Sequence, residues 1–232
     1  MKIKITLLSF LIPLLVLAQD KSKAYKVVSP NKQIEFKLEL TNKTLISIRN
    51  RGEVLLEPSE IAMDLNFEII GKNPKVRKIK RKSISENLTP VIKLKEASVS
   101  NNYNELIIYF RGNYSISLRA FNEGVAYRFN TSFKNDIVVN SETGEYTFPE
   151  NHNLWWGKET KFQSHNQVFY DYKSLEQTKK SDLASLPLII NAKNDLKIVI
   201  TETDLNNYPG MWLRGTSSKV ISRVSPKFPK TI

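Results

Sequence analysis

The chain has 232 residues, no cysteine and a formal net charge of +12 at pH 7. It therefore has no disulfide bonds and no cysteine-ligated metal site, and its stability has to come from an apolar core. A chain of this length can build such a core as one domain. The excess of basic residues makes nucleic acid or an anionic surface conceivable partners, so the placement of those residues matters.

The first twenty residues read MKIKITLLSFLIPLLVLAQD. Two lysines, an apolar run from Leu7 to Leu17 and the small residue Ala18 are typical of a cleavable signal peptide. The run is too short for a permanent transmembrane anchor. We expect residues 1–18 to be removed on export, leaving a secreted or periplasmic protein without a membrane anchor. Export without cysteine is typical of bacteria, here a Gram-negative one.

Apolar and polar residues alternate along most of the remaining chain, which predicts β-strands. Turn-forming residues separate the segments, and only residues 175–185 have the composition of a short helix. The sequence therefore predicts an all-β antiparallel sandwich with little helix, as one domain over residues 19–222, followed by the start of a proline-rich linker at 223–232. The alternating segments are residues 34–40, 61–69, 104–110, 114–121, 124–130, 186–190 and 196–202.

The basic residues cluster once, in KNPKVRKIKRK at residues 72–82. In an extended chain Lys78, Lys80 and Lys82 share one face. Lysines of this kind protect the exposed edge strand of a sheet from pairing with another chain. We favour that role over nucleic-acid binding, because an exported protein rarely meets nucleic acid.

No phosphate-binding loop, nucleophile elbow or His-Glu-x-x-His motif occurs in the sequence. The two histidines, His152 and His165, lie in irregular segments, and we interpret His152 as a loop residue. Trp155 and Trp156 are adjacent, so in a strand they face opposite ways. One is expected to anchor the core, and the other is available to stack on a sugar ring or a neighbouring domain.

The segment VITETDLNNYPGMWLRG, residues 199–215, begins as a strand and breaks into acids, amides and a Tyr-Pro-Gly turn. A carboxylate such as Glu202 at that point could hold a metal, act in catalysis or simply solvate the strand end. The residues alone favour the solvated strand end. Asp204 and Asn206 suit local side-chain bonds that cap the turn.

The order of these segments resembles the N-terminal domain of glycoside hydrolase family 97, a family of exported bacterial α-glycosidases. The similarity covers nearly the whole chain after the leader, and its most specific part is Glu-x-x-Leu-x-x-Tyr-Pro-x-Met, beginning at Glu202. The segments that carry it are VVSPNKQIEFKLEL, EVLLEPSEIAMDL, NYNELIIYFRG, LRAFNEGVAYRF, YTFPENHNLWW, LPLII and KIVITETDLNNYPGMWL.

The resemblance implies a β-supersandwich similar to the sugar-binding fold of galactose mutarotases. In that family a catalytic (β/α)₈ barrel and a small β-domain follow the N-terminal domain. The N-terminal domain forms part of the wall of the substrate pocket and contributes one glutamate ligand to a calcium ion. The matching glutamate is Glu202. The resemblance also implies α-linked carbohydrate as the ligand, and a wall or domain interface that contains Trp155, Trp156, Tyr208 and Met211.

In the family the catalytic carboxyl groups lie in the barrel, which needs about 250 further residues. We therefore expect no catalytic residue in this chain, no glycosidase activity from it alone, and weak calcium binding at most. A free-standing carbohydrate-binding module with the tryptophans as its platform is the main alternative. A purely structural exported sandwich that needs a partner is a third possibility.

Overall fold

The computed structural model describes residues 22–92, 95–206 and 208–226. Antiparallel strands make up this part of the chain, and its one helical element is the three-residue 3₁₀ turn η1 (Leu175–Gln177). The prediction of an all-β antiparallel fold is therefore confirmed. The predicted signal peptide and the last six residues of the predicted linker lie outside the described residues. No helix in the described part is long and apolar enough to cross a membrane.

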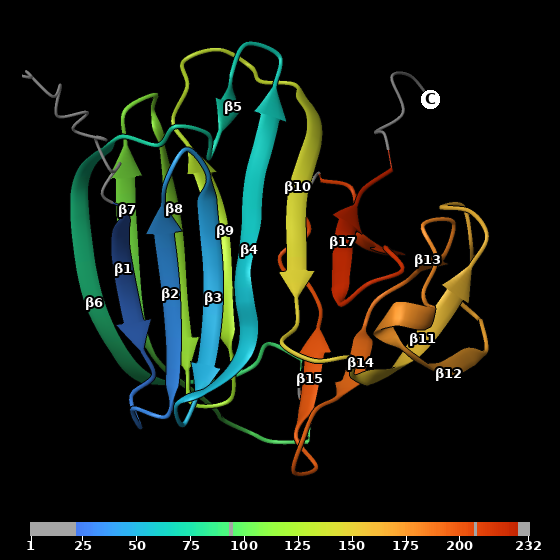
Figure 1. Cartoon of the computed structure of the whole chain (residues 1–232). Helices are drawn as coiled ribbons and strands as arrows, with labels where there is room; N and C mark the ends of the chain where they lie inside the picture. The colour runs from blue at the N-terminus through green and yellow to red at the C-terminus, as the bar shows by residue number, and fades with distance from the viewer. Residues whose placement is uncertain (1–21, 93–94, 207, 227–232) are drawn as a thin grey trace, which may run out of the picture.

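The first half of the chain forms a two-layered sandwich (Figure 1). One layer consists of β1 (Lys23–Val28), β2 (Ile34–Leu40), β3 (Thr44–Asn50) and β4 (Glu53–Leu65), with β5 (Ile69–Ile70) paired to β4. The other consists of β6 (Val76–Leu88), β7 (Val99–Phe110), β8 (Tyr114–Phe121) and β9 (Val125–Thr131). Each strand of this layer pairs with its neighbour in the sequence; short turns join β7 to β8 and β8 to β9, and a longer connection, residues 89–98, joins β6 to β7.

Alternation explains why these segments form a sandwich. Every second residue of β2 is buried, including Phe36 and Leu38, and Ile116 and Leu118 of β8 are buried in the same core. The side chains between them face solvent at least in part, as expected for strands with one covered face. The turn between β7 and β8 contains Gly112, whose φ of +95° is one that glycine adopts without strain.

The second half of the chain extends the first layer beyond β4. β10 (Val139–Thr147) pairs with β4 on one side and with β17 (Val220–Val224) on the other. The sheet continues through β16 (Trp212–Gly215), β13 (Leu183–Ala184), β11 (Asn153–Glu159), β14 (Leu188–Asn191) and β15 (Lys197–Ile200), and β12 (Tyr170–Ser174) pairs with β11. β17 ends at Val224, so strand structure continues two residues into the predicted linker.

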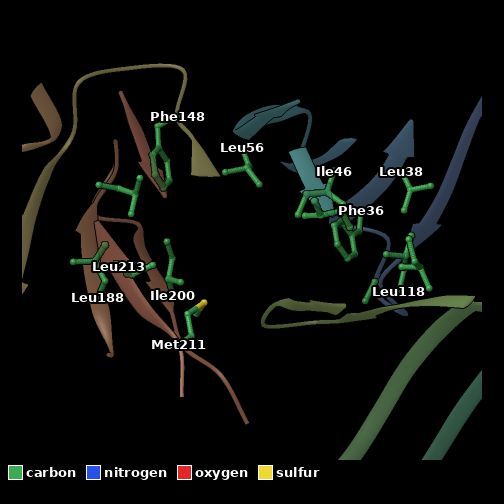
Figure 2. Close-up of a cluster of buried hydrophobic side chains, with 14 of the residues drawn as sticks. Phe36, Leu38, Ile46, Leu56, Leu118, Phe148, Leu188, Ile200, Met211 and Leu213 are labelled. Carbon is green, nitrogen blue, oxygen red and sulfur yellow. The ribbon is translucent and has the colours of Figure 1, made fainter. Parts of the chain in front are cut away.

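The apolar core has two lobes, one in each half (Figure 2). Phe36, Leu38, Ile46 and Leu118 belong to the sandwich lobe, and the second lobe contains Phe148, Leu188, Ile200, Met211 and Leu213. Leu56 of β4 lies between the two groups (Figure 2). The two halves therefore share one continuous core.

The structure differs from the sequence expectation at two strands and one helix. The strand expected at 61–69 is the end of the longer β4, and the strand expected at 196–202 stops at Ile200. The helix considered for 175–185 is only η1, followed by the short strand β13. Side chains compete with helical bonding there: Thr178 Oγ1 donates to the Leu175 carbonyl at 2.6 Å, and Asp182 accepts the Lys179 N–H at 3.1 Å.

The basic segment forms the edge strand that its pattern predicts. β6 lies at the end of the second layer and pairs only with β7 in the described structure. Lys78, Lys80 and Lys82 are exposed. Because each is opposite an alternate residue of β7, the three share one face.

Candidate functional site

The segment from Thr201 to Met211, between β15 and β16, holds the candidate metal ligand. Glu202 is half-buried, and its Oε1 accepts a hydrogen bond from the backbone N–H of Met211. Among the described residues, no hydrogen bond or salt bridge involves the other oxygen, Oε2. The carboxylate thus closes the loop through one of its two oxygens.

Asp204 and Asn206 form the turn inside this segment. Asp204 has a φ of +61°, and its Oδ1 accepts a hydrogen bond from Asn206 Nδ2 at 2.7 Å. Its other carboxylate oxygen is paired with Arg128 of β9. These contacts match the turn-capping role predicted for the two residues and tie the segment to the sandwich.

Glu202 does not form a metal site by itself. The described part of the chain contains no group of three or more His, Asp or Glu side chains that could hold a metal. Calcium takes six to eight oxygen ligands, and one carboxylate supplies at most two of them.

A mostly buried ion pair lies next to the segment. Glu142 of β10 and Arg223 of β17 face each other, with side chains only 10% and 15% exposed. The hydroxyl of Tyr208 donates to Glu142 Oε1 at 2.5 Å, which attaches the loop to the central strands. Gly144 makes room for the arginine, because a Cβ there would lie 2.9 Å from Arg223 Cβ.

The sequence analysis missed Glu142 and Arg223. One signal was available: Arg223 is two residues from Ile221, so in a strand the two share a face, and Ile221 is fully buried. A charged residue at such an inward position needs a partner. No local pattern indicates which carboxylate that partner is.

Two further tyrosines, Tyr127 of β9 and Tyr146 of β10, complete what we call the tyrosine cluster: Tyr127, Tyr146, Tyr208, Glu142 and Arg223. Burial raises the pKa of each tyrosine, and the charge of Glu142 adds to the effect. Burial alone would lower the pKa of Arg223, but the charge of Glu142 and the nearby tyrosines raise it. At neutral pH the tyrosines are therefore neutral, while Arg223 stays charged.

The tyrosine cluster also contacts the predicted pocket residue Met211. The Tyr146 hydroxyl lies 3.5 Å from Met211 Sδ, and Met211 is itself only 5% exposed. Met211 is thus a core residue in this structure. Tyr208 is half-buried, with its hydroxyl turned toward β10.

The adjacent tryptophans face opposite ways, as predicted for a strand. Trp156 is fully buried, with Lys173 Nζ 5.7 Å from its ring centroid. Trp155 is 42% exposed and packs against Tyr172 of β12, with ring centroids 4.7 Å apart. Trp155 thus lies against β12, whereas Tyr208 lies against β10, so the two partly exposed residues of the predicted wall occupy different parts of this half.

Trp155 belongs to an exposed aromatic platform, Trp155, Tyr170 and Tyr172, of which the sequence analysis missed the two tyrosines. Tyr170 lies over Gly157, where a Cβ would come within 3.2 Å of its ring. Asn191 Nδ2 donates to the Tyr172 hydroxyl at 2.9 Å. Exposed rings flanked by an amide are suited to a ligand with both apolar and hydroxyl groups.

The histidines take no part in these arrangements. The backbone N–H of His152 bonds to the Glu150 carbonyl, and its ring packs edge-on against Phe148, as suits a loop residue. Burial lowers the pKa of His152. His165 is exposed in an irregular segment.

Comparisons with known proteins identify the family to which this chain belongs. Residues 27–230 match the family model described as Glycosyl-hydrolase 97 N-terminal. A retaining alpha-galactosidase from Bacteroides thetaiotaomicron is 30% identical over 228 residues, which cover 94% of this chain and 34% of that protein.

Solved structures show the same fold. A glycoside hydrolase family 97 enzyme from Pseudoalteromonas sp. strain K8, in complex with acarbose, superimposes with a TM-score of 0.77 at 19% identity, over 87% of this chain and 32% of its own. A beta-arabinopyranosidase gives a TM-score of 0.76 at 18% identity, over 88% of this chain and 35% of its own. The chain thus spans about a third of the length of these relatives, and it belongs to the glycoside hydrolase family 97 N-terminal domain family.

Proposed function

We propose that the segment from Thr201 to Met211 faces the substrate pocket of an exported family 97 α-glycosidase, with Glu202 as one ligand of a calcium ion. The observation that carries the proposal is the state of the Glu202 carboxylate. One oxygen is fixed by the Met211 N–H, and the other has no partner among the described residues. A carboxylate held in this way is oriented before any ligand arrives, which reduces the entropy cost of binding.

The tyrosine cluster supports the same role. Through Tyr208 it ties the loop to β10 and β17, so that Glu202 is presented from a supported segment. A bound calcium ion would supply a fixed positive charge for carboxylates and sugar hydroxyls. If a second domain provides the remaining ligands, such a site would also fix the orientation of the two domains.

The substrate of the whole enzyme would be an α-linked carbohydrate. In support, the related enzyme from Pseudoalteromonas was solved with acarbose and, as a variant, with panose. The catalytic carboxyl groups would lie outside this chain. The leader supports export to the periplasm, which mass determination of the mature protein's N-terminus would test.

Calcium titration of this chain tests the role of Glu202. We expect a dissociation constant of about 1 mM or weaker, because one carboxylate supplies few of the ligands that calcium needs. Glu202→Gln should abolish the binding, whereas Asp204→Asn, the matched control in the same loop, should leave it. Binding in the micromolar range, or equal binding by the Glu202→Gln variant, would contradict the proposal.

The aromatic platform supports a second function, binding of carbohydrate without a catalytic partner. Trp155 and Tyr172 present exposed rings on adjacent strands, a geometry on which a pyranose ring can stack. Affinity electrophoresis of the isolated chain in gels containing soluble α-glucan tests this function. Retardation that Trp155→Ala removes would support it, and unretarded migration of the unmodified chain would exclude it for this ligand.

A further inference from the structure

The two layers of the sandwich leave an opening between their edge strands β1 and β6, which lie close together in Figure 1. Two cavities, of about 340 Å³ and about 470 Å³, lie along this opening. Three of the eight residues that line each cavity are basic. We call the two cavities together the basic cleft, defined by Lys23, Lys75 and Arg111 in the first and Lys26, Arg81 and Lys82 in the second.

Among the described residues, salt bridges compensate part of this charge, and they do so in the second cavity only. The one carboxylate in the two linings, Glu105, is only 4% exposed; Arg119 Nε lies 2.7 Å from its Oε1, and Lys82 Nζ lies 3.8 Å from its Oε2. Lys26 pairs with Glu35. Within the described residues, no carboxylate forms a salt bridge with Lys23, Lys75, Arg81 or Arg111.

The walls of the cleft are bonded across the two layers. Arg81 Nη1 donates to the carbonyl of Lys26 at 2.8 Å, and Asn104 Nδ2 donates to the carbonyl of Val28 at 2.8 Å. Each bond joins the second layer to β1. The two bonds fix Arg81 and the strand edges around the second cavity.

Protection of the edge strand accounts for the charges of β6, including the inward-pointing Arg81, but not for Lys75 and Arg111, which lie outside the strands. Arg81 is opposite Leu106 of β7, which is fully buried, so Arg81 projects toward the other layer. Lys78 and Lys80 lie on a different part of β6 from the cavity linings and suffice to protect the edge. Like charges around one opening repel one another, and an anion bound there would offset that repulsion.

We propose that the basic cleft binds a linear polysaccharide that carries sulfate or carboxylate groups. The charge of the cleft complements such a chain, and Ser22, Thr41, Ser83 and Asn104 provide hydrogen-bonding groups for sugar hydroxyls. Among the described lining residues none is aromatic, whereas sites for single-stranded nucleic acid commonly stack bases on aromatic rings. This site is independent of the role proposed for Glu202.

Binding of heparin oligosaccharides, measured by calorimetry at about 0.15 M salt, tests the proposal. The cleft variant Lys75→Glu/Arg111→Glu should bind at least about tenfold more weakly than the unmodified chain. The control Lys78→Glu/Lys80→Glu changes the net charge equally on the same edge and should weaken binding less than about threefold. Equal weakening by the two variants, or no binding by the unmodified chain, would overturn the proposal.

Two additions keep the test decisive. Thermal unfolding checks that both variants fold, and the single change Lys23→Glu at an exposed strand end replaces the cleft variant if it does not. Single-stranded DNA of matched charge and vesicles rich in phosphatidylglycerol serve as competing anions. Stronger binding to either of these than to heparin would overturn the assignment of a polysaccharide, and weaker binding would support it.

Discussion

The two halves of the molecule achieve stability differently. In the sandwich of β1 to β9, long strands alternate regularly and their inward residues are mainly apolar. In the half from β10 to β17, several strands have five residues or fewer, and a mostly buried ion pair lies beside the core. The first half thus relies on regular apolar packing, whereas the second half contains the mostly buried ion pair of Glu142 and Arg223.

The two halves also differ in their buried polar atoms without hydrogen-bond partners. Five buried side-chain atoms in the described structure have no hydrogen-bond partner, and all five belong to the second half: Glu142 Oε2, Trp156 Nε1, Glu159 Oε1, Arg223 Nε and Ser225 Oγ. Glu142 and Arg223 are close enough for an ion pair but lack hydrogen-bond geometry. Buried polar atoms without partners destabilise a fold, so we expect this half to be the less stable one.

The largest effect should come from the regular half. Phe36→Ala removes a fully buried ring from the sandwich core and should lower the free energy of unfolding by about 3–5 kcal/mol. Urea denaturation followed by tryptophan fluorescence measures it. The control Trp155→Ala, at a partly exposed ring, should cost clearly less. Similar losses for the two variants would contradict the stability difference between core and platform.

Arg223→Met should have the next largest effect, about 3 kcal/mol, because it leaves the carboxylate of Glu142 buried without its counter-charge. Hydrogen exchange should show increased opening in β17 and in residues 201–211, with β2 and β8 still protected. Replacing both partners, Glu142→Leu/Arg223→Met, should recover part of the loss. Uniformly increased exchange across the molecule would argue against two halves of different stability.

The smallest effect is the contribution of a single tyrosine, Tyr208, to a dependence of stability on alkaline pH. The tyrosine cluster has raised pKa values, so the folded protein keeps protons that the unfolded chain releases near pH 10. Stability should therefore fall as the pH rises above about 10, by at most about 1.4 kcal/mol per pH unit for each tyrosine. Tyr208→Phe should make this fall shallower in urea titrations at several pH values. An unchanged slope would show that Tyr208 keeps no extra proton in the fold.

Much of the regular half was predictable from the sequence, because local alternation determines which residues face the core. The bounds of β2 and β8 agree with the segments expected at 34–40 and 114–121. Alternation also predicted that Trp155 and Trp156 face opposite ways, but not which of them is buried. That depends on strands that are distant in the sequence.

The tyrosine cluster could not be predicted in the same way. Its members come from β9, β10, β17 and the loop after β15, and a charged residue in a strand does not identify its partner. Tyr170 and Tyr172 were missed because YDYKS, the sequence of β12, is short and its alternation rests on two tyrosines alone, so the segment was not expected to be a strand. The Glu202 segment was singled out by its unusual composition, but its residues alone favoured a solvated strand end, and only the family resemblance pointed to a metal ligand.

The position of β17 has a consequence for how the protein is made. This strand, at residues 220–224, lies between β10 and β16 in the sheet. The strand that joins β10 to the rest of the second half is therefore synthesised long after β10 itself. During synthesis the strands of the sandwich can pair with their neighbours in the sequence. The edge of β10 that later binds β17 stays unpaired until residues 220–224 have been made. A version shortened before residue 220 would keep that edge exposed permanently, and self-association through it would be its characteristic failure.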